Sequence, residues 1–312
     1  MTEQRCAEGA EAAADPLMAS APPAVRWVLV EHSGPWGRRA LSGSGFDPSV
    51  ARALGDWARS SADWARSSAG RVTLIRRPGT GRTSGTQRCW YLVDSRSGHE
   101  SVRAGSYAEE RELLDVIDGR TAGEAVEHPL YLVCTHGKHD TCCAIRGRPV
   151  AAALAAEFPE RTWECTHVGG DRFAANLVVL PHGFYYGHVP AGAVVDLVRR
   201  HDKGQLEPRW LRGRSSVPAA VQAAQHHARV ATGEHGLASF APLGVESTGV
   251  ESTGVESTGA GEWLVRLSAP DADLAVRVRE RRVDTGRRLT CSATAEGSVR
   301  TFELVDLQQV PH

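Results

Sequence analysis

The sequence predicts an α/β protein that ends in a small β-rich module. Between residues 25 and 230, short apolar runs alternate with longer segments of helical character, which is typical of α/β domains. Beyond a linker, short apolar runs separated by turn residues indicate antiparallel strands. The chain has 312 residues, of which 41% are hydrophobic and 23% charged. This composition is that of a globular protein, and the length suggests about two domains.

Charge and hydropathy exclude several classes of protein. The formal net charge is -1, so we expect neither a general nucleic-acid binder nor a protein of anionic membranes. No run approaches the roughly 20 consecutive apolar residues that cross a bilayer. Residues 1–23 are rich in alanine and glutamate and end in two prolines. We predict a disordered leader there, without the features of a signal peptide, and a cytoplasmic location.

Residues 24–128 are predicted to form an N-terminal α/β lobe. The lobe opens with a strand at 25–30, and two more strands follow at 72–75 and 90–93 around a glycine-rich loop at 79–85. The heptapeptide DWARSSA occurs twice in succession. This spacing places Trp57 and Trp64 on one helix face, where core packing is the expected role.

Residues 129–231 are predicted to form a second α/β domain. Its elements alternate between strand and helix and then form a hairpin, which is the order of a thioredoxin-like domain with a shortened middle helix. Pro149 is expected to open the first helix, and Pro218 precedes a further helix. The expected strands are 130–134, 162–165, 173–180 and 184–189, and the expected helices are 149–158 and 192–201.

The last two segments are a linker and a small module. The pentapeptide VESTG occurs three times from Val245 onward, and a polar unit this short cannot bury a core. We therefore predict a linker at 232–262. Residues 263–312 are predicted to form a β-rich module with strands at 263–267, 274–278 and 299–305, docked on the main body because it is too small to be stable alone.

Cysteines are clustered along this chain. Seven are present, and four of them lie between residues 134 and 165. An odd number, clustered, in a chain without an export signal favours metal binding or redox chemistry over a disulfide framework.

Two short segments combine cysteine with histidine. One runs from Cys134 to Cys143 (CTHGKHDTCC) and the other from Cys165 to Asp171 (CTHVGGD). Each begins at the carboxyl end of a predicted strand, and such ends are neighbours in an α/β sheet. Thiolates and imidazoles bind zinc or an iron-sulfur cluster, and a helix that starts just after Cys143 would stabilise anionic thiolates. The pattern therefore predicts a metal centre.

The same segments resemble a known family. They resemble the sucrase/ferredoxin-like family, a branch of the thioredoxin-like 2Fe-2S ferredoxins. The resemblance lies in YLVCTHG at 131–137, CTHVGGDRFAAN at 165–176, PHG at 181–183 and YG at 186–187. Weaker similarity lies at 27–36, 76–79 and 210–216. The resemblance implies a thioredoxin-like ferredoxin domain at 129–231 that packs on the N-terminal lobe.

The resemblance also implies a ligand set for a 2Fe-2S cluster. Cys134 and Cys143 match the first pair, which has eight residues between its cysteines. Cys142 is one residue out of register and is the alternative to Cys143. His167 matches the first histidine of the second pair, and Asp171 stands where some relatives have the second histidine.

The fourth ligand stays open at this point. Asp171 fits the family register, but a carboxylate is a harder donor than thiolate or imidazole, so Cys165 is the better candidate on chemical grounds. Other polar groups near these segments are expected to be solvated, hydrogen-bonded or, for the cations, to balance cluster charge: His136, His139, His182, His188, Lys138 and Arg146.

The expected function is electron transfer between redox donor and acceptor proteins that the sequence does not identify. A thioredoxin-like dithiol oxidoreductase and a structural zinc protein are the alternatives, since the same ligands suit both. The oxidoreductase is disfavoured because the sequence has no Cys-x-x-Cys motif. Despite the family description, we expect no sucrose hydrolysis, because no segment presents an obvious pair of carboxylates for glycoside chemistry.

Overall fold

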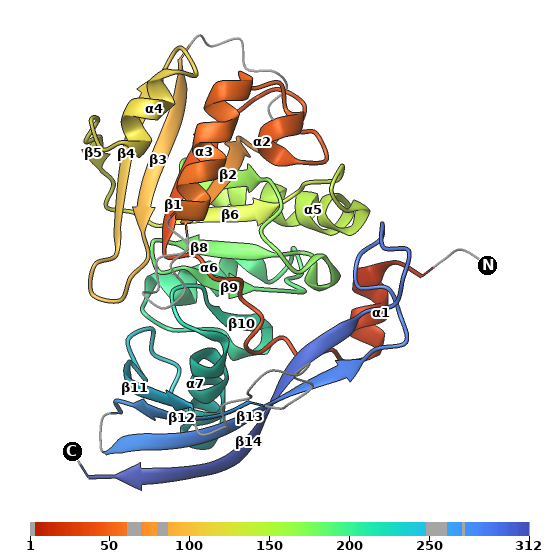
Figure 1. Cartoon of the computed structure of the whole chain (residues 1–312), viewed down its shortest axis with the longest axis vertical. Helices are drawn as coiled ribbons and strands as arrows, with labels where there is room; N and C mark the ends of the chain where they lie inside the picture. The colour runs from red at the N-terminus through yellow and green to blue at the C-terminus, as the bar shows by residue number, and fades with distance from the viewer. Residues whose placement is uncertain (1–3, 61–69, 80–86, 248–260, 270–271, 312) are drawn as a thin grey trace, which may run out of the picture.

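The computed structural model describes residues 4–60, 70–79, 87–247, 261–269 and 272–311. A ten-stranded mixed sheet forms the centre of the molecule (Figure 1). Its strands, in spatial order, are β10 (Leu211–Arg214), β9 (Phe184–Tyr186), β8 (Leu177–Leu180), β6 (Leu130–Cys134), β7 (Thr162–Cys165), β2 (Gly70–Arg76), β1 (Arg26–Glu31), β3 (Arg88–Asp94), β4 (Ser101–Tyr107) and β5 (Glu124–Ala125).

The N-terminal lobe and the second α/β domain share this sheet. They join where β2 runs antiparallel to β7, with Ile75 opposite Cys165. The Thr166 N–H donates to the Leu74 carbonyl at 2.9 Å, and the Leu74 N–H donates to Thr166 Oγ1 at 3.0 Å. Backbone and side-chain hydrogen bonds therefore join the two halves of the sheet at the end of β7, next to the predicted metal-binding segment that begins at Cys165.

The sheet is strongly curled. Five strand-to-strand steps separate β1 from β9, which would be about 24 Å in a flat sheet. Yet the rings of Trp27 in β1 and Tyr185 in β9 have centroids only 6.2 Å apart. Alternate residues of each strand point to the same face of the sheet. On the concave face, side chains from the N-terminal lobe therefore meet side chains from the second domain in one shared core. This core holds Trp27, Leu29, Ile75, Leu132, Trp163 and Tyr185 among others.

Helices cover the outer face of the curled sheet. The N-terminal strands pack against α3 (Pro48–Ser60) and α4 (Glu112–Ile117), and Trp57 contributes to that core as predicted. Strands β6, β8 and β9 pack against α5 (Thr141–Glu157) and α6 (Val194–Asp202). Short α2 (Ala40–Gly43) and the 3-10 turns η2 (Asp171–Phe173) and η3 (Pro208–Trp210) complete these two layers. The predicted partner Trp64 lies outside the described residues.

Strands β6, β7, β8 and β9 form the thioredoxin-like unit. Strands β6 and β7 are parallel, whereas β8 pairs antiparallel with β6 and β9 antiparallel with β8. The predicted strands at 130–134 and 162–165 have these bounds. The strand expected at 173–180 begins only at Leu177, because the chain first forms the turn η2.

The helix predicted to open at Pro149 begins eight residues earlier, at Thr141. Its N-cap is Asp140, whose carboxylate accepts the Cys142 N–H at 2.8 Å. The cap satisfies a donor that the helix cannot satisfy itself. Pro149 lies inside the helix instead. Cys142 and Cys143 consequently belong to the first helical turn and not to a loop.

A second sheet forms the C-terminal module. Its antiparallel strands are β11 (Pro242–Ser247), β12 (Glu262–Leu267), β13 (Asp273–Asp284) and β14 (Ser298–Val310). Helix α7 (Ala219–Thr232) packs on its apolar face. The module thus starts within the segment predicted as linker. The second and third VESTG copies lie outside the described residues, as does most of the glycine-rich loop at 79–85.

The prediction of a disordered leader is wrong for residues 4–23. Helix α1 (Cys6–Ala12) is ordered, with Cys6 and Ala7 buried. It lies beside the far end of the long β13–β14 hairpin (Figure 1). Small residues allow this close packing, and composition alone did not reveal the distant partner. No helix among the described residues is long and apolar enough to cross a membrane.

The β2–β7 junction generates a stability prediction. Replacing Thr166, which is 2% exposed, with valine keeps the shape but leaves the Leu74 N–H without its acceptor. We expect a loss of about 1–3 kcal/mol in the free energy of unfolding, measured by denaturant titration. Thr301→Val, at an exposed hydroxyl, should change it by less than about 0.5 kcal/mol. Equal losses in the two variants would contradict this account of the junction.

Candidate metal centre

The two cysteine- and histidine-containing segments meet at one edge of the sheet. Cys134 ends β6 and Cys165 ends β7, and their Cα atoms are partners in the parallel ladder. The segments that follow therefore leave the sheet side by side. The prediction that these strand ends are neighbours is confirmed.

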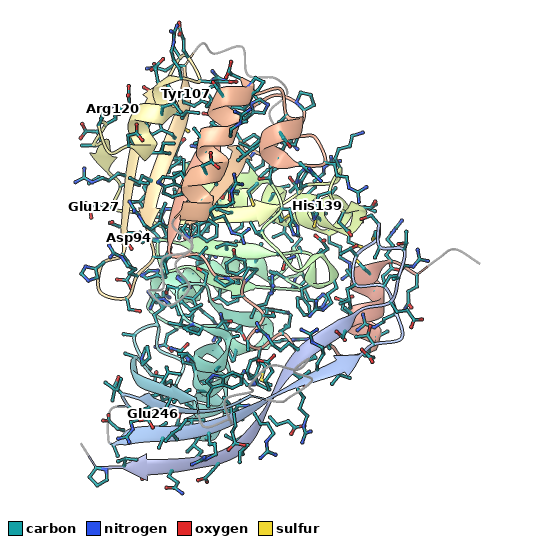
Figure 2. All side chains as sticks on the ribbon, viewed as in Figure 1. Asp94, Tyr107, Arg120, Glu127, His139 and Glu246 are labelled. Carbon is teal, nitrogen blue, oxygen red and sulfur yellow. The ribbon has the colours of Figure 1, made fainter. Side chains whose placement is uncertain are left out.

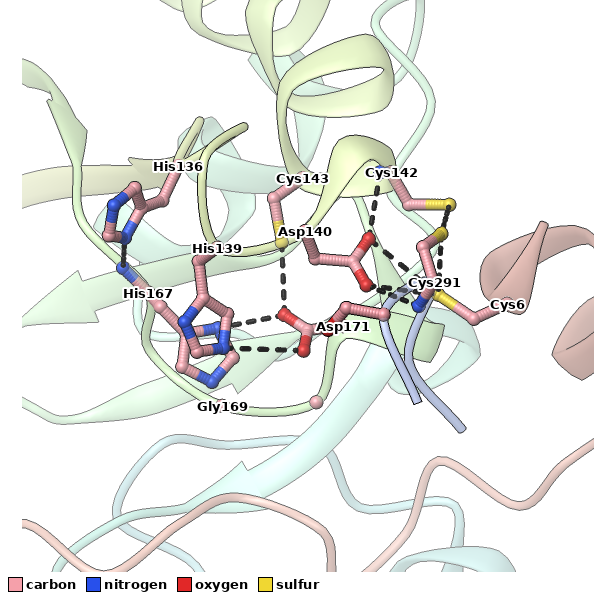
Figure 3. A network of polar contacts seen from close by, with 12 residues as sticks. Cys6, His136, His139, Asp140, Cys142, Cys143, His167, Gly169, Asp171 and Cys291 are labelled. Atoms are coloured by element: carbon pink, nitrogen blue, oxygen red, sulfur yellow. Dashed lines mark hydrogen bonds and ion pairs between the residues drawn. The ribbon is translucent and has the colours of Figure 1, made fainter. Parts of the chain in front are cut away.

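Cys134, Cys143 and His167 converge at this edge, with their ligand atoms all within 4.8 Å of one another. Asp171 closes the group, since its Oδ1 lies 2.8 Å from His167 Nδ1 and accepts the Cys143 thiol at 3.2 Å. We call these four residues the principal site, of which Cys143, His167 and Asp171 are labelled in Figure 3. It brings together two thiols, an imidazole and a carboxylate from the two segments.

Cys165 and Cys142 lie outside the principal site. Cys165 is fully buried in the core shared by the two halves and belongs to none of the candidate metal-binding groups formed by the described residues. Strand β7 ends at Cys165, so the strand alternation that would align Cys165 with His167 is lost. Cys142 belongs to another group of side chains, because consecutive helical residues point about 100° apart.

Hydrogen bonds shift the pKa values of the groups in the principal site in different directions. A hydrogen bond from Cys143 lowers the pKa of the Cys134 thiol despite its burial, and the same contact raises the pKa of Cys143. Burial lowers the pKa of His167, but its bonds to Asp171 and Cys134 outweigh burial and raise that pKa to about 9. Burial raises the pKa of Asp171, and hydrogen bonds from His139 and His167 lower it below its usual range. Anionic donors thus face a protonated imidazole, whose proton a metal ion would displace.

Two neighbouring histidines have different roles. His136 is 2% exposed; its Nδ1 accepts the His167 N–H at 3.2 Å and its Nε2–H donates to the Gly37 carbonyl at 2.7 Å. These bonds hold the backbone of His167. The His139 ring stacks on the His167 ring with centroids 3.8 Å apart and lies beside α5 in Figure 2. The His139 side chain is 34% exposed and that of His167 is 26% exposed, so the principal site reaches the surface at His167.

Of the other polar candidates, His182, His188 and Arg146 contact residues outside the principal site. His182 contacts His201 through their ring nitrogens at 3.1 Å. His188 and Arg146 both pair with Glu11 of α1, at 3.3 and 2.7 Å. Lys138 is exposed.

Arg212 holds the turn between His167 and Asp171, a role that sequence reasoning missed. Its buried guanidinium donates to the Gly169 carbonyl at 2.9 Å and to Asn176 Oδ1 at 2.7 Å. Asn176 in turn donates to the Gly170 carbonyl at 2.9 Å. Both residues lie in stretches quoted above for the family resemblance, which was the available signal.

The conformation and the close packing of this turn require glycine at positions 169 and 170. Gly169 and Gly170 have φ of +99° and +79°, a region that favours glycine. A Cβ on Gly169 would lie 2.5 Å from Pro22, and one on Gly170 would lie 2.5 Å from Arg212. The space that a side chain at either position would need is thus occupied by this chain's own residues.

Gly170 and Gly98 form a matched pair for a test. Both have φ of +79°, but nothing lies within 4 Å of a Cβ on Gly98. Gly98→Ala should cost about 1–2 kcal/mol of stability from backbone strain alone. Gly170→Ala adds a collision with Arg212, worth a further 1–3 kcal/mol or so. Denaturant titration of both variants measures the difference, and equal costs would show that Arg212 does not restrain the turn.

Comparisons with known proteins place the chain in a family. No curated protein matches it. Similar solved structures include two serine-for-cysteine variants of the thioredoxin-like 2Fe-2S ferredoxin from Aquifex aeolicus. Each is 22% identical and covers 28% of this chain and 100% of its own, with TM-scores of 0.24 and 0.25.

A family model described as sucrase/ferredoxin-like matches residues 17–213. The matched region is more than half of the chain. It includes both segments of the candidate metal centre as well as Arg212, which holds the turn between His167 and Asp171. The chain therefore belongs to the sucrase/ferredoxin-like family.

Proposed function

We propose that this protein is an electron carrier whose principal site binds a 2Fe-2S cluster. The observation that carries the proposal is the convergence of Cys134, Cys143 and His167 within 4.8 Å, with Asp171 in contact with two of them. Thiolates and imidazoles are the donors used by such clusters. A bound cluster would supply a reversible one-electron couple.

The donor set fits the cluster as two pairs. Cys134 and Cys143 would form one pair, from the end of β6 and the first turn of α5. His167 and Asp171 would form the other, from the turn that Arg212 holds. Proximity favours Asp171 over Cys165 as the fourth ligand, because Asp171 contacts His167 at 2.8 Å and Cys165 is absent from each metal-binding group found in the described part of the chain.

The surroundings suit electron transfer without a substrate pocket. The His167 side chain is 26% exposed, and His139 stacks on it from the solvent side. Redox donor and acceptor proteins would dock on this face, where a short path leads to the principal site. Positive charge on the exposed Lys138 favours acidic partners.

Burial disfavours the dithiol oxidoreductase. Thiol-disulfide exchange requires an accessible thiolate, whereas Cys134 and Cys143 are 1% and 0% exposed. A zinc ion is the second candidate ligand of the principal site. The convergence of two thiols, an imidazole and a carboxylate supports zinc binding as well, because zinc accepts all of these donors. Colour distinguishes the two, since zinc bound to thiolates is colourless.

Anaerobic purification, a visible spectrum and analysis of iron and sulfide test the proposal. We expect a red-brown protein with about two irons per chain. Cys143→Ala and Asp171→Ala should lose colour and iron, whereas Cys165→Ala should keep both. Cys89→Ala, a half-buried cysteine of β3 outside the principal site, is the control. A colourless protein that holds one zinc at Cys143 would overturn the cluster, and loss of iron from Cys165→Ala alone would make Cys165 the fourth ligand.

The imidazole ligand predicts a change in reduction potential. Histidine ligands raise the potential of a 2Fe-2S cluster relative to cysteine ligands. His167→Cys should therefore retain the cluster and lower its potential in a spectroscopic titration. His182→Asn, at a histidine paired with His201, should leave the potential unchanged. An unchanged potential in His167→Cys would remove His167 from the ligand set.

A further inference from the structure

A second group of metal-binding side chains lies next to the principal site. Cys6 of α1, Cys142 of α5 and Cys291 of the β13–β14 connection meet at Asp140, and their ligand atoms all lie within 4.8 Å of one another (Figure 3). We call these four residues the terminal cluster, because two of its cysteines lie near the ends of the chain. All three cysteines are free thiols.

The distances in the terminal cluster match the edges of a zinc tetrahedron. A Zn–S bond of about 2.3 Å and a Zn–O bond of about 2.0 Å give S···S edges of about 3.8 Å and S···O edges of about 3.5 Å. Cys142 Sγ lies 3.4 Å from Cys291 Sγ, which lies 3.5 Å from Cys6 Sγ. Cys6 Sγ lies 3.6 and 3.7 Å from the two Asp140 oxygens. Small outward movements would accommodate the ion.

Backbone hydrogen bonds orient the carboxylate of Asp140. Its Oδ1 accepts the Cys142 N–H at 2.8 Å and its Oδ2 accepts the Cys291 N–H at 2.6 Å. Each carboxylate oxygen has a second lone pair available. Asp140 is 2% exposed, and a buried carboxylate is costly unless it is paired or coordinates a metal ion. Hydrogen bonds of this kind to metal ligands increase metal affinity.

Two guanidinium groups lie near the terminal cluster. Arg172 and Arg287 share the single carboxylate of Asp15, and Arg172 interacts electrostatically with Cys6. The local excess of positive charge would be balanced by a zinc ion bound to three thiolates and one carboxylate, which carries a net charge of about -2. A cavity of about 380 Å³ lined by Cys6 and Cys291 gives an ion access from solvent.

We propose that Cys6, Cys142, Cys291 and Asp140 form a structural zinc site. Closed four-coordinate sites of cysteine with a fourth protein donor are typical of structural zinc. The site ties the N-terminal helix and the C-terminal hairpin to the first turn of α5. No oxidation is involved: the thiols lose protons on binding and zinc does not change its oxidation state. The inference does not depend on the electron-transfer function.

Zinc and iron measured together on the purified full chain test the zinc site. The wild type should hold one zinc per chain. Cys6→Ala and Cys291→Ala should each lose it and keep the iron content of the wild type. Cys143→Ala should keep zinc whatever happens to iron, and Cys89→Ala should keep both metals as the matched control. If the principal site does not bind a 2Fe-2S cluster, the wild type will lack iron. If the terminal cluster does not bind zinc, the wild type will lack zinc.

Protection from alkylation keeps the test independent of variant folding. In the wild type, zinc should protect Cys6, Cys142 and Cys291 from a thiol reagent, and a chelator should expose them. Cobalt titrated into the chelated protein should give the visible bands of a thiolate-bound ion. Absence of zinc in protein that also fails to bind added zinc would overturn the site, as would a peptide joining Cys142 to Cys291 by a disulfide in the native protein.

Discussion

Cys134 and Cys165 are partners at the ends of two parallel strands, and the geometry of the candidate metal centre depends on this pairing. It places the segment that begins at Thr135 beside the segment that begins at Thr166. The Thr135 N–H also donates to the Cys165 carbonyl at 3.1 Å, so the register is maintained one residue beyond the ladder. A shift of one residue would turn Cys134 to the opposite face of the sheet, where α5 packs.

A buried guanidinium has a large desolvation cost, and the position of Arg212 shows what offsets it. Burial lowers the pKa of Arg212 to about 9. The cost is offset by hydrogen bonds to Ser20, Gly169 and Asn176. These partners come from the N-terminal segment, the glycine turn and the following chain. Removal of Arg212 would leave their oxygens without donors, so one residue of β10 fixes both the turn that carries Asp171 and the entry of the chain into the sheet.

The sequence predicted the elements whose signal is local. Strands at 130–134 and 162–165 are short apolar runs with clear ends, and their bounds were predicted correctly. The start of α5 was predicted wrongly. Proline is common at the first position of a helix, so Pro149 was a stronger signal than the N-cap residue Asp140. The four residues carried over from the family resemblance do lie together. The meeting of Cys6 and Cys291 with Asp140 is a contact between distant segments, which no local pattern encodes.

Cys142 and Cys143 serve two groups of donors from one helical turn. Consecutive residues of a helix differ in direction by about 100°, so one thiol points to Cys134 and the other to Cys291. The N-terminus of α5 carries partial positive charge, which stabilises thiolates on both sides. Because the backbone of a helical turn is stiff, a zinc ion that fixes Cys142 would also fix the position of Cys143. The packing of α1 and of the β13–β14 connection against the first turn of α5 would then restrain the geometry of the proposed electron-transfer centre, through the peptide unit that joins Cys142 to Cys143.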